Sequence, residues 1–312
     1  MATPGRILVT PRSVTKAGHP SLQRLRDAGW EVVFCAPGKQ PDEAELIRLL
    51  PGCAGYLAGV EKITARVLEA ATELRVISRN GTGVDNIDAE AARARGIAVC
   101  RAEGANARGV AELTFALMLA LARSIPFCDR SLKNGGWERP TGLELSGKTL
   151  SLVGCGRIGR LVAGFGLAFD MEVLAYDPAP DSTFAPSPRF RYAGLDDILC
   201  RADVLSLHAP PARDGRPLID RKVLQRMKRG AYLINTARGG LMDNEAVLAA
   251  LETGQLAGVA LDAFDPEPPS DLRLVSHARV IATPHAGGLT HESVDRAIEG
   301  AVNNLLEALP KR

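Results

Sequence analysis

Short apolar stretches alternate with amphipathic stretches along the first hundred residues of the chain. The apolar stretches are rich in Ile, Val and Leu, as buried parallel strands are, and the amphipathic stretches have helical spacing. We expect strands at 6–10, 31–34, 54–57, 75–78 and 97–99, and helices at 20–28, 42–50, 65–71 and 89–95. This alternation predicts a parallel sheet covered by helices.

Residues 110–123 are apolar on nearly all sides, which predicts a buried helix at a domain junction. Residues 124–148 are expected to be irregular, and the alternation then resumes. We expect strands at 149–153, 171–176, 204–207, 232–235, 258–261 and 280–282, helices at 160–165, 220–227 and 244–253, a proline-rich loop at 178–188 and a final amphipathic helix at 291–309. The chain therefore contains two complete α/β units, each with a doubly wound parallel sheet.

The turn after the predicted strand 149–153 reads GCGRIG, with glycines at Gly154, Gly156 and Gly159. The first permits a tight turn, the second lets a pyrophosphate approach the backbone, and the third lets the helix pack on the strand. The next predicted strand ends in Asp177, which suits the hydroxyls of an adenosine ribose and repels a 2′-phosphate. The sequence therefore predicts a dinucleotide site that takes NAD rather than NADP.

Composition agrees with a globular protein of two domains. The chain has 312 residues, 46% hydrophobic and 24% charged, with a net charge of +2. Nothing in this balance indicates a nucleic-acid or membrane partner, and the longest apolar run is too short to span a bilayer. Because the N-terminus lacks the apolar core of a signal peptide, we expect a cytoplasmic protein. The scattered cysteines are expected to be buried, reduced thiols, and no metal site is expected.

Three polar residues follow predicted strands of the second unit, where open α/β sheets bind ligands: Arg238, Glu267 and His285. An arginine holds a carboxylate with two bonds, and a histidine transfers protons near neutral pH. A neighbouring glutamate orients the imidazole and stabilises its protonated form. Each residue taken alone also fits a simpler role. Arg238 fits a helix-cap or phosphate contact, Glu267 a solvated loop carboxylate and His285 a loop histidine. Together, behind a nucleotide turn, they indicate oxidation of a 2-hydroxy acid at C2.

A second glycine turn, NGTGVDNID at Asn80–Asp88, ends the predicted strand 75–78. We interpret its backbone N–H groups as a clamp for the substrate carboxylate across an interdomain cleft; the alternative is a plain strand-to-helix turn. The candidate substrate-binding residues are Arg79, Asn80, Gly81, Thr82, Gly83, Arg238 and His285. The candidate cofactor-binding residues are Gly154, Gly156, Arg157, Ile158, Gly159, Asp177, His208, Ala209, Pro210, Thr236, Ala237, Asp262 and Gly287. Of these, Asp262 is expected to bond the nicotinamide amide.

Several segments together resemble the D-isomer-specific 2-hydroxyacid dehydrogenases over nearly the whole chain. They are NGTGVDNID, VAELTFALMLALAR, GKTLSLVGCGRIGR with YDP, INTARGG, GVALDAFDPEP and TPHAGG. The resemblance implies NAD(P)-linked oxidoreduction at C2, a catalytic set of Arg238, Glu267 and His285, and a homodimer built largely on the nucleotide domain. It also implies a Rossmann NAD-binding domain, residues 102–286, inserted into a flavodoxin-like substrate domain of residues 1–101 and 287–312.

Within the family, the stretch GGWERPTGLELSGKTL is similar to that of the phosphoglycerate dehydrogenases, and Arg79 and Arg139 match their basic residues. The end at Arg312 implies the short form without a regulatory domain. Ala58 stands where those enzymes have a phosphate-contacting arginine. Two substrates therefore remain as alternatives. One is 3-phosphoglycerate, and the other is a smaller acid of the kind that a glyoxylate or hydroxypyruvate reductase uses. A further alternative is a corepressor-like protein that binds NAD(H) without turnover.

Overall fold

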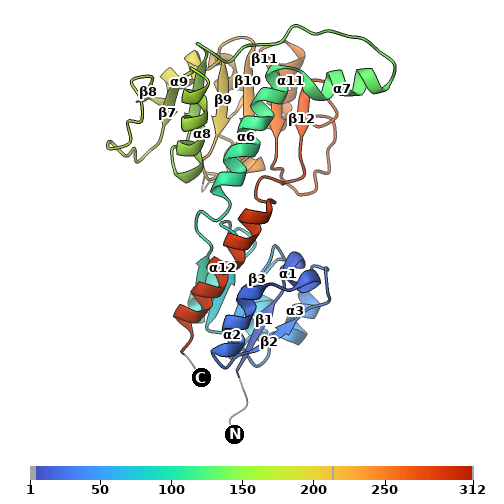
Figure 1. Ribbon diagram of the computed structural model, residues 1–312, viewed down its shortest axis with the longest axis vertical. Helices are drawn as coiled ribbons and strands as arrows, with labels where there is room; N and C mark the ends of the chain where they lie inside the picture. The colour runs from blue at the N-terminus through green and yellow to red at the C-terminus, as the bar shows by residue number, and fades with distance from the viewer. Residues whose placement is uncertain (1–4, 213, 311–312) are drawn as a thin grey trace. The chain divides into compact units, whose positions relative to one another are not determined.

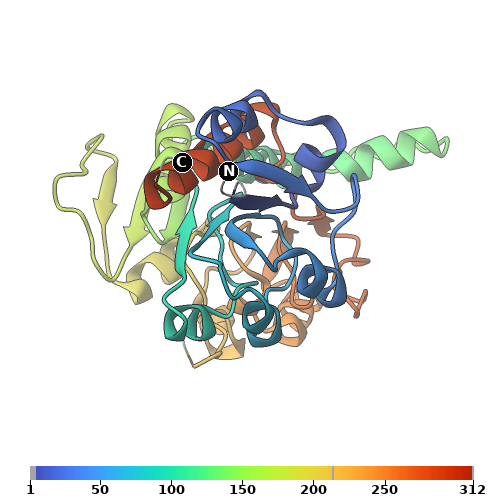
Figure 2. The same cartoon turned by 90° about the horizontal axis from the view of Figure 1, so that it is seen from below.

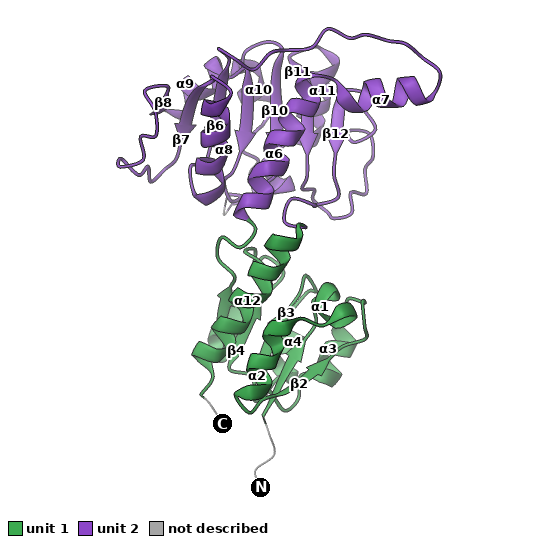
Figure 3. Cartoon of the chain, viewed as in Figure 1, with its two compact units in different colours: residues 1–106, 290–312 green, residues 107–289 purple. Residues whose placement is uncertain are grey.

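The computed structural model describes residues 5–212 and 214–310. The chain divides into two compact units, which Figures 1 and 3 show: unit 1 contains residues 1–106 and 290–312, and unit 2 contains residues 107–289. Each unit has its own parallel sheet and its own apolar cores.

Unit 1 has a sheet of five parallel strands in the order β2-β1-β3-β4-β5. The strands are β1 (Arg6–Val9), β2 (Glu31–Phe34), β3 (Cys53–Ala58), β4 (Val76–Arg79) and β5 (Ala98–Arg101). The helices are α1 (Arg12–Ala17), η1 (Pro20–Leu22), α2 (Gln23–Asp27), α3 (Glu43–Leu49), α4 (Ala65–Ala70), α5 (Ala89–Ala94) and α12 (His291–Ala308). Apolar residues of α2 and α12 cover one face, and those of α3 and α4 cover the other; Figure 2 shows α12 in red beside this sheet. This is the flavodoxin order of strands.

Unit 2 has a sheet of seven parallel strands in the order β12-β11-β10-β9-β6-β7-β8. The strands are β6 (Thr149–Val153), β7 (Glu172–Tyr176), β8 (Phe190–Tyr192), β9 (Val204–Leu207), β10 (Ala231–Asn235), β11 (Leu256–Leu261) and β12 (Val280–Ala282). The helices are α6 (Ala107–Ala122), α7 (Ile125–Lys133), α8 (Arg157–Ala168), α9 (Leu195–Arg201), α10 (Arg221–Arg226), η2 (Gly239–Leu241) and α11 (Asn244–Glu252). Apolar residues of α6 and α8 cover one face, and those of α9 to α11 cover the other. This is the Rossmann order with one further strand.

The expectation that residues 124–148 are irregular is wrong where α7 lies. Pro126 stands in the first turn of α7, where a helix tolerates proline, although it reads as a breaker in the sequence. None of the nine residues of α7 is buried, so no apolar stripe facing a core marks the helix. The short elements α1, β8 and α9 were also not expected.

The cysteines are free thiols, but they are not uniformly buried as expected. Cys35, Cys53 and Cys155 are buried, Cys100 and Cys128 are half-buried, and Cys200 is exposed. Among the described residues, no single helix is long and apolar enough to cross a membrane; α6 and α7 meet that criterion only as a pair, bent by 62°.

Candidate active site

The glycine turn joins β6 to α8 at the point where the strand order of unit 2 reverses. Gly154 has φ +94°, which favours glycine, and a Cβ there would lie 2.5 Å from His208 O. A Cβ at Gly159 would overlap Gly154 O, so the helix packs directly on the turn. Gly156, the N-cap of α8, is exposed, and a Cβ there would have no neighbour within 4 Å. The turn is therefore closed toward the sheet and open on the outside, which fits a pyrophosphate at the helix N-terminus.

Two polar residues flank this turn. Asp177, just after β7, accepts hydrogen bonds from Cys155 N and Ala179 N, both at 2.9 Å. These bonds hold the acid beside the glycine turn, where an acid that binds the ribose of a dinucleotide is expected. His208 follows β9, and its Nε2 lies 2.9 Å from Ser206 Oγ. Burial lowers the pKa of His208 to about 4, so the imidazole is neutral at pH 7.

The remaining cofactor candidates lie on the same edge of the sheet or on α8. Arg157 and Ile158 begin α8, and Ala209 and Pro210 follow His208 beyond β9. Thr236 and Ala237 follow β10, where Thr236 Oγ1 bonds Thr114 Oγ1 of α6 at 2.7 Å. These positions, together with the open turn and Asp177, fit a bound dinucleotide.

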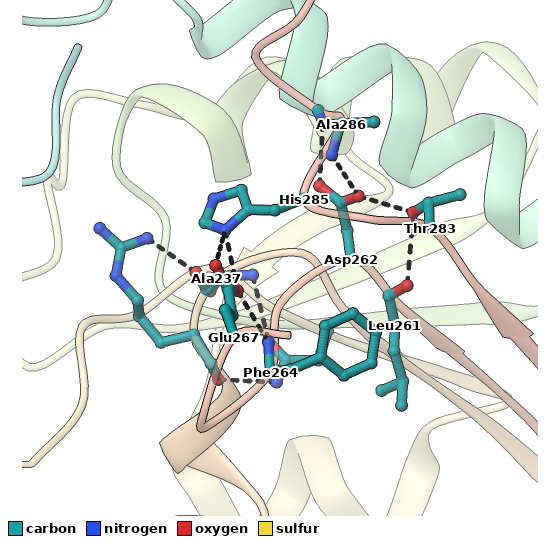
Figure 4. A network of polar contacts seen from close by, with 11 residues as sticks. Ala237, Leu261, Asp262, Phe264, Glu267, Thr283, His285 and Ala286 are labelled. Atoms are coloured by element: carbon teal, nitrogen blue, oxygen red, sulfur yellow. Dashed lines mark hydrogen bonds and ion pairs between the residues drawn. The ribbon is translucent and has the colours of Figure 1, made fainter. Parts of the chain in front are cut away.

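His285 and Glu267 form a close pair, which Figure 4 shows from nearby. Nδ1 of His285 lies 2.9 Å from both carboxylate oxygens of Glu267. Glu267 Oε1 also accepts a hydrogen bond from Phe264 N at 3.0 Å, which holds the carboxylate toward the ring. The side chains are 48% and 41% exposed, and ion pairs this exposed contribute little to stability. The pair is therefore better suited to proton transfer than to holding the fold.

Arg238 lies in a turn after β10 that Asn235 shapes. Asn235 is fully buried; its Nδ2 donates to Arg238 O at 2.8 Å and its Oδ1 accepts from Ala237 N at 3.1 Å. A Cβ on Gly239 would overlap the backbone of Phe264 and Asp265. The turn that carries Arg238 therefore packs directly on the loop that leads to Glu267. Asn235, the last residue of β10, was not among the residues expected from the sequence, although an Asn where a strand runs into a turn is a signal for such a turn.

Asp262 holds the loop that carries His285. Its carboxylate is 1% exposed at the end of β11 and accepts hydrogen bonds from Thr283 Oγ1 (2.6 Å), Ala286 N (2.7 Å) and Gly287 N (2.9 Å). His285 lies between these donors with φ +52°, a left-handed conformation that is uncommon without glycine. Figure 4 shows Asp262 joined to Thr283 and Ala286, which come before and after His285 in the sequence. Asp262 therefore positions the imidazole, a role that the sequence did not indicate.

We expect Asp262→Asn to lower kcat about tenfold to a hundredfold, because an amide nitrogen would face a backbone N–H and displace the His285 loop. Steady-state kinetics with the cofactor and the class of acid that the sequence predicts measure this loss. Asp197→Asn, on the exposed surface of α9, is the matched control. An unchanged kcat in Asp262→Asn would contradict the positioning role.

The second glycine turn lies in unit 1 after β4. Gly81 has φ +145°, and Thr82 Oγ1 bonds Asn106 Oδ1 at 2.9 Å. Asn80 N donates to Ala58 O at 2.8 Å, so the turn is joined to the end of β3. The Arg79 guanidinium donates to Asn80 O, and Gly83 completes the turn. The substrate-binding candidates of unit 1 thus form one segment.

Comparisons with known proteins agree with this arrangement. Residues 115–287 match the family described as D-isomer specific 2-hydroxyacid dehydrogenase, NAD binding domain. The D-3-phosphoglycerate dehydrogenase of Rattus norvegicus is 40% identical over 278 residues, 88% of this chain and 52% of that protein. The hydroxypyruvate reductase of Thermotoga maritima is 41% identical over 261 residues, 82% of this chain and 84% of that protein. The crystal structure of the TT0316 protein from Thermus thermophilus superposes with a TM-score of 0.88 at 40% identity, covering 98% of this chain and 97% of that chain.

The chain spans about half the length of the phosphoglycerate dehydrogenases that it matches. It spans most of the hydroxypyruvate reductase and nearly all of the TT0316 protein. The family match covers the glycine turn, Arg238, Glu267 and His285, and it assigns NAD binding to unit 2. The chain belongs to the D-isomer specific 2-hydroxyacid dehydrogenase family.

Proposed function

We propose that the protein is an NAD-dependent oxidoreductase that interconverts a small D-2-hydroxy acid and the corresponding 2-oxo acid. The observation that carries this proposal is the His285–Glu267 pair, whose loop packs against the turn that carries Arg238. All three residues follow strands of the NAD-binding domain, where ligands of such sheets bind.

Each residue of the site has a part in the proposed reaction that follows from the chemistry of its side chain. Bound NAD supplies the acceptor for the hydride that leaves C2. Arg238 holds the substrate carboxylate through two parallel N–H bonds. Because Nδ1 of His285 is bonded to Glu267, Nε2 takes the hydroxyl proton, and Glu267 stabilises the imidazolium that forms. In the reducing direction, His285 returns this proton to the carbonyl oxygen.

Unit 1 supplies the remaining substrate contacts in this proposal. Residues Asn80–Gly83 present backbone N–H groups in a glycine turn, and Arg79 adds a cation beside them. We therefore assign unit 1 as the substrate domain and unit 2 as the cofactor domain.

Two substrate classes fit the family relatives. One relative acts on 3-phosphoglycerate by its name and the other on hydroxypyruvate, and their identities to this chain are nearly equal at 40% and 41%. Ala58 favours the smaller acid, because the phosphoglycerate dehydrogenases that the chain resembles have a phosphate-contacting arginine at this position.

We also propose that the protein is a homodimer assembled through unit 2. The segment of α7 and the loop after it exposes large apolar side chains: Ile125, Phe127, Leu132 and Trp137. Exposed apolar groups gathered in one segment are typical of a protein interface.

A panel of 2-oxo acids tests the proposed activity. With NADH we expect turnover of at least one small acid among glyoxylate, hydroxypyruvate, pyruvate and phosphohydroxypyruvate, followed as loss of NADH absorbance. Tight NADH binding without turnover of any acid would contradict the proposal and favour a corepressor-like binding protein.

A further inference from the structure

Glu61 is a buried carboxylate in unit 1 that the proposed reaction does not use. It is 1% exposed in the loop after β3. Its Oε1 accepts hydrogen bonds from Tyr56 Oη (2.6 Å) and Gly59 N (2.8 Å), and Thr10 Oγ1 donates a further, short one. A Cβ on Gly59 would lie 2.6 Å from Oε2, so the loop closes tightly over the carboxylate. A buried carboxylate is costly unless donors compensate it, and three donors converge on this one.

Glu61 lies at the switch point of the unit 1 sheet. β2 lies on one side of β1 and β3 on the other, so the order of strands reverses between β1 and β3. Open α/β sheets bind ligands outside the carboxyl ends of the strands at such a point. Thr10 directly follows β1 and Glu61 follows β3, and the two side chains are bonded to each other there. A negative charge therefore lies where a ligand of unit 1 is expected.

The loop of Glu61 is continuous with the glycine turn assigned to the substrate carboxylate. Asn86 Nδ2 donates to Glu61 O at 2.7 Å, and Asn80 N donates to Ala58 O at 2.8 Å. Ile63 N also donates to Asn86 O at 2.8 Å. These bonds join the end of β3 to the glycine turn, so the Glu61 loop lies next to the segment assigned to the substrate carboxylate.

The carboxylate of Glu61 and the lack of a cation at position 58 suit one substrate carboxylate better than a carboxylate and a phosphate. Ala58, in register with Arg79, is fully buried and carries no cation. Burial, and next the charge of Glu61, raise the pKa of Tyr56 well above its usual value, so the phenol stays a donor. Val60 is 59% exposed and presents an apolar side chain on the same loop. A phosphate ester carries a charge of roughly −1.5 to −2 at pH 7, which Glu61 would repel.

We propose that Glu61 is a specificity-determining residue, which makes the enzyme select 2-oxo and 2-hydroxy acids with an uncharged C3 substituent over their phosphate esters. This inference rests on the proposed dehydrogenase activity. Glu61 acts through the electric field of its carboxylate and through the shape of the loop that it stabilises. It does not touch the reacting atoms.

The test compares kcat/KM for hydroxypyruvate and phosphohydroxypyruvate with NADH. We expect wild type to favour hydroxypyruvate by about tenfold or more, and Glu61→Gln to raise the phosphohydroxypyruvate/hydroxypyruvate ratio about tenfold, because the charge is removed at constant size. Glu73→Gln, an exposed acid of unit 1 before β4, should leave the ratio unchanged. The wild-type preference needs no variant, so it tests the proposal even if Glu61→Gln fails to fold.

Two outcomes overturn the inference while the proposed function stands. One is wild-type turnover of phosphohydroxypyruvate at equal or better efficiency, and the other is a folded Glu61→Gln variant with an unchanged ratio. Turnover of neither acid, nor of any other 2-oxo acid, would instead contradict the proposed function itself.

Discussion

Replacement of His285 by alanine is expected to lower kcat by about 10² to 10⁴, the usual contribution of a positioned acid–base group. The variant loses the group that takes the hydroxyl proton in the proposed reaction, and it leaves Glu267 without its partner 2.9 Å away. NAD affinity should stay nearly unchanged, because the glycine turn and Asp177 lie at other strand ends of the sheet. Steady-state kinetics and NADH fluorescence titration measure the two quantities separately.

The matched control is His291→Ala, an exposed histidine at the start of α12, which should retain wild-type turnover. Near-normal kcat in His285→Ala would mean that another group transfers the proton. An equal loss of turnover in both variants would point to damage unrelated to the site.

Replacement of Arg238 by alanine is expected to lower kcat/KM for the 2-oxo acid by about 10² to 10⁴, since the two charge-assisted hydrogen bonds proposed to hold the carboxylate are lost. KM should rise and kcat should fall together, because the same contact positions the substrate for hydride transfer. The backbone of the turn should persist, since Asn235 Nδ2 bonds the carbonyl of residue 238 and not its side chain.

Arg238→Lys separates charge from geometry. Lysine keeps the positive charge but cannot form the parallel pair of bonds, so we expect activity between wild type and the alanine variant. If Arg238→Ala left the KM of the acid unchanged, the arginine would not hold the carboxylate.

Much of the fold followed from local patterns. The buried strands of unit 2 are short runs rich in Val, Ile and Leu, and the helices between them have apolar spacing; both signals depend only on neighbouring residues. Gly154 and Asp177 were predictable as a pair because the spacing of the fingerprint spans a single strand–helix–strand unit. Arg238, Glu267 and His285 were expected from their places after strands, and the structure brings Glu267 and His285 into contact.

Other features depend on contacts between distant segments. Asp262 bonds the loop of residues 283–287, and Glu61 bonds Thr10, 51 positions earlier in the chain. Residues close in the sequence give no indication of either contact. The sequence pattern therefore indicated only a cofactor role for Asp262 and no role for Glu61. Helix α7 was missed for a different reason: Pro126 reads as a breaker in the sequence, although it stands in the first turn, where a helix tolerates proline.

Isotope transfer tests the proposed hydride route between cofactor and substrate. NADH carrying deuterium at both C4 positions is supplied with the 2-oxo acid that the enzyme turns over best, and the product is analysed for label and configuration. We expect the D-2-hydroxy acid with deuterium at C2, formed far more slowly by His285→Ala. A product without deuterium at C2, or of the L configuration, would contradict the proposed reaction.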